Sequence, residues 1–111
     1  MLPVQNQKKT SMTKINSDNL SQYKLLDVVK FITAKNERGE YKENYGRVIV
    51  RALKSISDLM PDRENATAED VMNRLDELAE QFVSNGNMKP QTGSIFKTRC
   101  RKAFKDFLEG Q

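Results

Sequence analysis

One apolar pattern constrains the fold more than any other feature of this chain. Between about Glu40 and Met60, nonpolar residues recur at the spacing of one helix face until Pro61 interrupts the run. The residues of this stripe are Tyr41, Tyr45, Val48, Ile49, Ala52, Leu53, Ile56, Leu59 and Met60. Gly46 lies within the run, where it either permits a close helix crossing or is simply tolerated. We therefore predict that residues 40–60 form the central packing helix.

One more helix is predicted before residues 40–60 and another after them. The first begins at Asn19, where Asn19 and Gln22 can form a cap, and ends at Gly39. Its apolar face contains Leu25, Leu26, Val28, Val29 and Ile32. The other begins at Thr67, with Asp70 placed for a capping box, and ends at Gly86. Its stripe contains Val71, Leu75, Leu78, Ala79 and Phe82.

A fourth helix is predicted from Pro90, a residue favoured in the first turn because its missing N–H would have no partner there. Its apolar face contains Phe96, Cys100, Ala103, Phe104, Phe107 and Leu108. No strand pattern is found. With 111 residues and 37% hydrophobic content, the chain can bury one small core. We expect an all-α, compact four-helix bundle over residues 19–110.

Composition argues against several classes of function. The chain has no histidine and one cysteine, so it lacks the usual general base, Ser-His and Cys-His nucleophile pairs, and the common zinc patterns. Cys100 is interpreted as a small buried apolar residue. We expect no enzyme activity, no metal, no cofactor and no small-molecule substrate.

The N-terminal segment differs from the rest. Residues 1–18 are polar and basic, with Lys8, Lys9 and Lys14 opposed by Asp18, and they show no periodicity. We predict a disordered leader, which either does nothing specific or follows a DNA groove as an arm. No segment has the apolar length of a membrane span or the apolar centre of a secretory signal, so a cytoplasmic protein is expected.

Charge is unevenly distributed along the chain. Residues 62–88 contain two cations and seven acids, whereas residues 89–111 contain six cations and two acids. A surface without a task usually mixes its charges, and a polarised field suits a polyanionic partner. This distribution favours a nucleic-acid surface over a neutral solvated face.

The last helix concentrates that positive charge. Lys97, Arg101 and Lys105 recur every four residues and form one ridge, flanked on the solvent side by Arg99 and Lys102. Near its start, Thr92 and Ser94 help to bind a phosphate oxygen, or one of them caps the helix or merely satisfies the local backbone. The bland alternative for the ridge is an ordinary solvated helix face.

A second basic ridge lies on the predicted central helix and contains Arg47, Arg51 and Lys54. These residues either bind the opposite phosphate strand or form ion pairs with the acidic third helix. The acids of that third helix offer a different class of function, a protein-interaction or inhibitor module that binds a basic partner. They are Glu69, Asp70, Asp76, Glu77 and Glu80, and some are also explained as helix N-terminal charges.

The string KPQTGSIFKTRCRKAFKDFLE resembles the last helix of the N-terminal core-binding domain of tyrosine recombinases of the phage-integrase type. In that pattern a threonine opens the helix, an aromatic residue follows, and basic residues precede a second aromatic. The matching residues are Thr92, Phe96, Lys97, Arg99, Arg101 and Phe107. Gly93 departs from the apolar residue expected there. Residues 19–60 also look like the opening helices of such a domain, so the resemblance covers roughly residues 19–109.

The resemblance implies a SAM-like helical bundle that lies across duplex DNA during recombination and integration by a mobile genetic element. The family's catalytic residues belong to a separate domain, so this chain is expected to be the binding domain of a longer recombinase or a free-standing relative. Its expected partners are double-stranded DNA and a recombinase catalytic domain or other protein. The expected DNA-binding residues are Thr92, Ser94, Lys97, Arg99, Arg101, Lys102, Lys105, Arg47 and Arg51.

Overall fold

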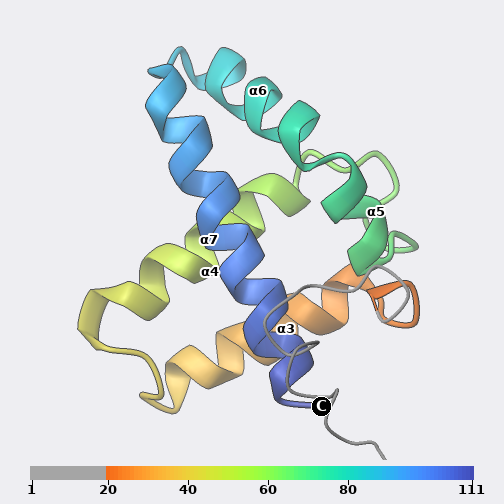
Figure 1. Cartoon of the computed structure of the whole chain (residues 1–111), viewed down its shortest axis with the longest axis vertical. Coiled ribbons are helices and arrows are strands. Elements are labelled where there is room, and N and C mark those ends of the chain that lie inside the picture. Colours follow the sequence, from red (N-terminus) through yellow and green to blue (C-terminus); the bar gives the residue numbers. More distant parts are fainter. Residues whose placement is uncertain (1–19) are drawn as a thin grey trace, which may run out of the picture.

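A computed structural model describes residues 20–111 and contains five helices in that range (Figure 1). They are α3 (Leu25–Glu37), α4 (Glu43–Ser57), α5 (Ala68–Asn73), α6 (Leu75–Gly86) and α7 (Pro90–Glu109). Within residues 20–111 the only β pairing is an isolated bridge between Lys24 and Thr67. The predicted all-α class is confirmed for this part of the chain. The predicted leader, residues 1–18, lies outside it.

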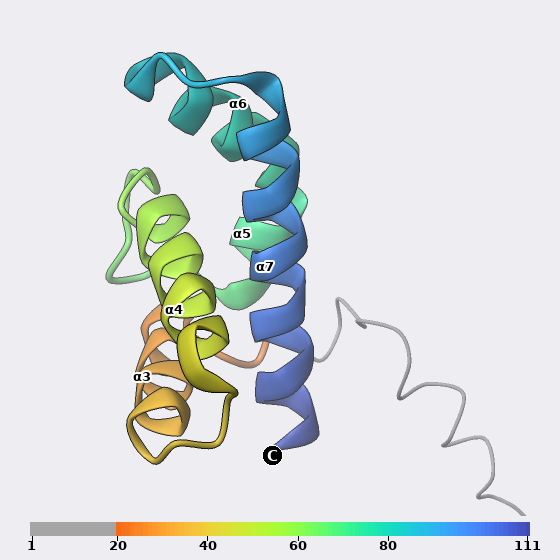
Figure 2. The same cartoon turned by 90° about the vertical axis from the view of Figure 1, so that its left-hand side faces the viewer.

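The longest helix, α7, packs against α3, α4 and α6. Figure 2 shows α7 along one side of the molecule, with α3 and α4 next to each other on its inner side and α6 at one end. The buried face of α7 includes Phe96, Cys100, Ala103, Phe104 and Phe107, as the apolar pattern predicts. Leu108 is partly buried at the edge of the core. None of the helices in residues 20–111 has the length and hydropathy of a membrane span.

The core joins α4 to α7 directly. On α4 the buried residues are Gly46, Ile49, Ala52, Leu53, Ile56 and Ser57. The Cys100 thiol donates to the backbone carbonyl oxygen of Ala52 over 3.6 Å, and its burial raises the pKa of Cys100 from 9.0 to about 12. Cys100 is therefore the buried small residue that was predicted.

The first predicted helix begins later than expected. Helix α3 starts at Leu25 and not at residue 19, and Asn19, the predicted cap, lies outside the described residues. The backbone N–H of Leu25 donates to Ala66 O (2.9 Å) and that of Ala68 donates to Tyr23 O (2.9 Å). Because these bonds to residues 66–68 flank Lys24 and hold it extended, α3 begins only after Lys24.

The single third helix predicted over residues 67–86 is wrong, because the helix is divided at Arg74. The backbone of Arg74 has φ −111° and ψ 15°, outside helical values. Helix α5 packs on α3, whereas α6 packs on α7 and α4, so the bend allows two apolar faces to be buried in different directions. The predicted capping box is confirmed, because Asp70 N donates to Thr67 Oγ1 (3.1 Å) and Thr67 N donates to Asp70 Oδ2 (2.9 Å).

The remaining helix ends differ only slightly from the predictions. The chain turns after α3 at Gly39, and α4 ends at Ser57, shortly before Pro61. After α6 it is Asn87, and not Gly86, that adopts the left-handed conformation, with φ 54°. Helix α7 begins at Pro90 as predicted. Gly93 is buried in its first turns, where a side chain would collide with Val83 of α6.

Candidate nucleic-acid interface

The outer face of α7 presents basic and hydroxyl side chains. Arg101 is exposed, Lys105 is half-buried, and neither forms an ion pair with any of residues 20–111. Thr98 and Ser94 are exposed on the same side, which lies opposite the buried face of the helix. This surface, defined by Ser94, Thr98, Arg101 and Lys105, is called the α7 outer face below.

Two of the predicted DNA-binding lysines at the edges of this face are already paired. Lys97 Nζ donates to Asp76 Oδ1 of α6 over 3.0 Å, and this hydrogen bond holds the pKa of Asp76 below its ordinary value. Lys102 Nζ lies 3.0 Å from Asp106 Oδ1, and hydrogen bonding to Asp106 raises the pKa of Lys102. The positive charge of both lysines is therefore partly compensated within the protein.

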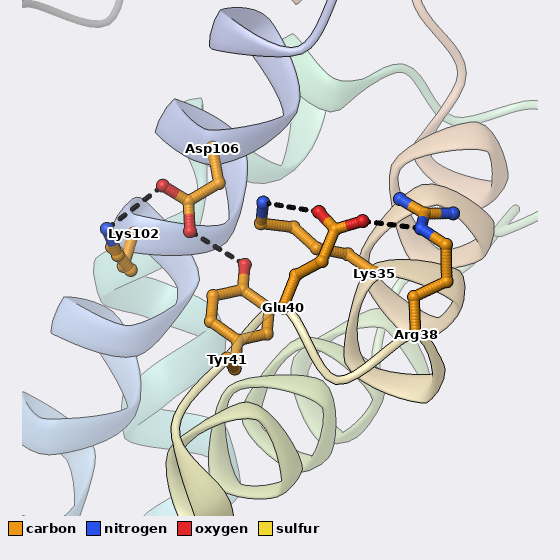
Figure 3. Close-up of polar contacts among 6 residues, drawn as sticks. All are labelled: Lys35, Arg38, Glu40, Tyr41, Lys102 and Asp106. Carbon is orange, nitrogen blue, oxygen red and sulfur yellow. Dashed lines mark hydrogen bonds and ion pairs between the residues drawn. The ribbon is translucent and has the colours of Figure 1, made fainter.

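Asp106 was not singled out by sequence reasoning. Its carboxylate is buried in α7, where it accepts a hydrogen bond of 2.7 Å from the hydroxyl of Tyr41, a residue of the loop just before α4 (Figure 3). Burial, followed by this hydrogen bond, raises the pKa of Tyr41. The only local signal was the i,i+4 spacing from Lys102. Because Asp106 points inward, its carboxylate is not part of the α7 outer face.

A second set of polar contacts, centred on Glu40, lies in the loop between α3 and α4, next to Tyr41. Glu40 accepts hydrogen bonds from Lys35 Nζ (3.1 Å) and Arg38 Nε (2.6 Å), which lower its pKa (Figure 3). Lys35 Nζ also lies 5.4 Å from the centre of the Tyr41 ring. These contacts order the loop that delivers Tyr41 to Asp106.

Thr92 and Ser94 lie in the first two turns of α7. The helix has no side-chain cap, so the interpretation of either residue as a cap is wrong. The backbone N–H of Thr92 bonds to Lys89 O (3.0 Å), and Ser94 O accepts a hydrogen bond from the Thr98 hydroxyl (3.1 Å). The Ser94 hydroxyl thus remains available on an exposed side chain.

The two predicted basic ridges do not share a surface. Arg47, Arg51 and Lys54 are exposed on the side of α4 opposite its buried residues, and α7 packs on the buried side. Arg47 donates to Asn44 Oδ1 of its own helix (3.0 Å). Among residues 20–111, none of the three forms an ion pair with the acidic segment, so that alternative is not supported.

Most acids of the predicted protein-interaction surface are engaged inside the chain. Asp70 completes the capping box, Asp76 pairs with Lys97, and Glu77 accepts from Arg74 Nη2 over 3.1 Å. Glu69 and Glu80 form no ion pair with the described residues. The acidic surface of α5 and α6 is therefore smaller than the sequence suggests.

Within residues 20–111, no group of three or more Cys, Asp or Glu side chains is placed to hold a metal ion. Comparison with protein-family models, with curated proteins and with solved structures finds no match for this chain.

Proposed function

We propose that this chain is a DNA-binding module that docks the α7 outer face on the phosphate backbone of duplex DNA. The observation that carries the proposal is the arrangement of Arg101 and Lys105, which are accessible, lie one helical turn apart and form no ion pair with residues 20–111. The charge of Arg101 also helps to lower the pKa of Asp76, but Asp76 pairs with Lys97 and not with Arg101. Cations in this state can neutralise phosphates and release their counterions.

The environment of this pair supports the same function. Of the two acids in α7, Asp106 is buried and engaged with Tyr41 and Lys102, and Glu109 is at the last residue of the helix. The hydroxyls of Ser94 and Thr98 extend the face toward the start of the helix. The Ser94 hydroxyl can donate to a phosphate oxygen, whereas the Thr98 hydroxyl already donates to Ser94 O. Lys97 and Lys102 border it, and their partial compensation makes them weaker phosphate ligands.

We further propose that the fold is of the SAM-like, core-binding type found in phage-integrase tyrosine recombinases, and that the module acts beside a separate catalytic domain. The order of the helices and the residues Thr92, Phe96, Lys97 and Arg101 support this proposal. Since Arg47 and Arg51 lie on the far side of α4 from α7, one duplex that docks on α7 is not held by both ridges.

Salt titration of binding to a duplex of about 30 base pairs tests the proposal, because the slope of log K against log[salt] counts neutralised phosphates. Changing Arg101→Glu together with Lys105→Glu should weaken binding and reduce the slope by roughly 2, at about 0.9 per lost phosphate contact.

The control variant carries Arg47→Glu and Arg51→Glu, the same change of charge on the opposite side of α4. It should retain most of the affinity and the slope of the unchanged protein, and circular dichroism should show both variants folded. No binding of the unchanged protein at low salt, or equal losses in the two variants, would reject docking through α7.

A further inference from the structure

A small cleft between α4 and α7 adjoins the α7 outer face. It has a volume of about 310 Å³ and is lined by Tyr45, Ser94, Ile95, Thr98 and Arg99. Two of its lining residues, Ser94 and Thr98, belong to the α7 outer face as well. An anion bound on that face would therefore lie next to the opening of the cleft.

The cleft exposes apolar surface that the core does not use. Tyr45 is 45% exposed and Ile95 is 46% exposed, and both are among the few large hydrophobic side chains so exposed in residues 20–111. Tyr45 belongs to the apolar stripe of the sequence, so its exposure is a departure from the predicted core. Exposed apolar groups gathered in one hollow indicate a binding surface more often than scattered ones do.

The Tyr45 ring is held in place by the ring of Tyr41. It packs edge to face with the Tyr41 ring, at a centroid distance of 5.9 Å and an interplanar angle of 80°. Tyr41 is in turn fixed by its hydrogen bond to the buried Asp106 carboxylate. A supported, half-exposed aromatic ring offers a flat surface on which another ring can stack.

The polar groups of the cleft indicate which kind of aromatic ligand it could bind. Arg99 contributes a guanidinium that forms no ion pair with residues 20–111, and no carboxylate lines the cleft. The Ser94 hydroxyl can donate to or accept from heteroatoms at the edge of a ring, and the Thr98 hydroxyl, which donates to Ser94 O, can accept from them. An aromatic platform, a cation and hydroxyl groups together match a nucleobase with its attached phosphate.

From this geometry we propose that the cleft binds one unpaired nucleobase of a single-stranded DNA segment that adjoins the duplex on α7. The base stacks on Tyr45 against Ile95, and Arg99 contacts its phosphate. A base within a duplex has both faces covered by its neighbours, so only an unpaired base can stack there. The inference rests on the proposed docking of duplex DNA, and it adds that DNA with a single-stranded extension is the preferred substrate.

The test compares a blunt duplex with the same duplex carrying a short thymine overhang, by fluorescence anisotropy. Stacking on an aromatic residue should make the overhang substrate bind roughly five- to hundredfold more tightly. Tyr45→Ala should remove this preference while leaving blunt-duplex binding unchanged, and Tyr45→Phe should keep it. Met88→Ala, at a 40% exposed apolar residue outside the cleft, is the matched control and should keep it too.

A second measurement uses the unchanged protein and does not depend on any variant folding. Iodouracil in the overhang should crosslink on irradiation to the peptide that contains Tyr45. Equal affinity for the two substrates, or a preference that survives in Tyr45→Ala, would overturn the inference and leave docking through α7 intact. Binding of the overhang substrate and its free single strand, without binding of the blunt duplex, would instead reject the duplex proposal and retain the base site. Failure of all three DNAs to bind would reject both.

Discussion

The hydroxyl of Tyr41 lies 2.7 Å from Oδ2 of Asp106, and this hydrogen bond joins the loop before α4 to the last turns of α7 across 65 positions of sequence. On the solvent side, Lys102 Nζ lies 3.0 Å from Oδ1, the other oxygen of the Asp106 carboxylate, and neutralises its charge. The buried charge is therefore both paired and hydrogen-bonded, the condition under which a carboxylate is tolerated in a core. The same contact supports the ring against which Tyr45 packs.

Replacing Tyr41 by phenylalanine should destabilise the fold. The ring remains, but Asp106 loses a donor, and hydrogen bonds to charged groups contribute about 1.5–3 kcal/mol. We expect the free energy of unfolding in urea to fall by roughly 2 kcal/mol. Tyr45→Phe is the control, because the Tyr45 hydroxyl forms no hydrogen bond with residues 20–111, and it should have little effect. Equal losses in the two variants would contradict this role of the Tyr41 hydroxyl.

The buried thiol of Cys100 should make stability sensitive to alkaline pH. Its pKa is raised from 9.0 in the exposed state to about 12 in the fold. The unfolded chain therefore loses this proton first, so the contribution is fully present below about pH 9 and is lost as pH rises toward 12. At about pH 10 the loss should be about 1 kcal/mol.

Urea unfolding at about pH 8 and about pH 10 measures this loss, and Cys100→Ala should reduce it. Tyr41 adds a loss of the same sign above its ordinary pKa, since the fold raises that pKa as well. The effect of the thiol is therefore the difference in the free energy of unfolding between the unchanged protein and Cys100→Ala, measured at each pH. An identical pH dependence in both proteins would exclude a contribution from the thiol.

Gly46→Ala should destabilise the fold, although alanine in a helix interior is normally about 1 kcal/mol more favourable than glycine. A Cβ atom at residue 46 would collide with the Asn36 side chain and with Cβ of Tyr41. Overpacking of this kind costs typically about 1–3 kcal/mol. Thermal unfolding should show the loss, and adding Asn36→Ala should recover part of it. A gain in stability for Gly46→Ala alone would show that the neighbours move aside without cost.

Asp76→Asn should strengthen DNA binding if α7 docks as proposed. The change removes the carboxylate that lies 3.0 Å from Lys97 and so frees a cation at the edge of the α7 outer face. One more neutralised phosphate should steepen the salt slope by about 0.9. Glu69→Gln removes the same charge from α5 without releasing a cation, so its salt slope should stay unchanged. Equal slopes for the two variants would mean that Lys97 does not reach the DNA.

The helical class, the apolar faces and the capping box at Thr67 can be predicted from the sequence alone. Stripes such as Phe96, Cys100 and Phe104 depend only on helical periodicity, and the Thr67–Asp70 capping box depends only on residues three apart. The start of α7 at Pro90 is likewise a local matter. Such features can be predicted because every group involved lies within about one helical turn along the chain.

The position of the bend between α5 and α6, and which charges remain unpaired in residues 20–111, depend on packing between distant segments. No glycine or proline marks Arg74; the helix divides there because α5 and α6 bury their faces against different partners. Lys97 meets Asp76, and Asp106 meets Tyr41, through contacts between residues distant in the sequence. The basic ridges of α4 and α7 each follow from periodicity, but their opposite directions follow from packing, because the buried side of α4 lies between Arg51 and α7.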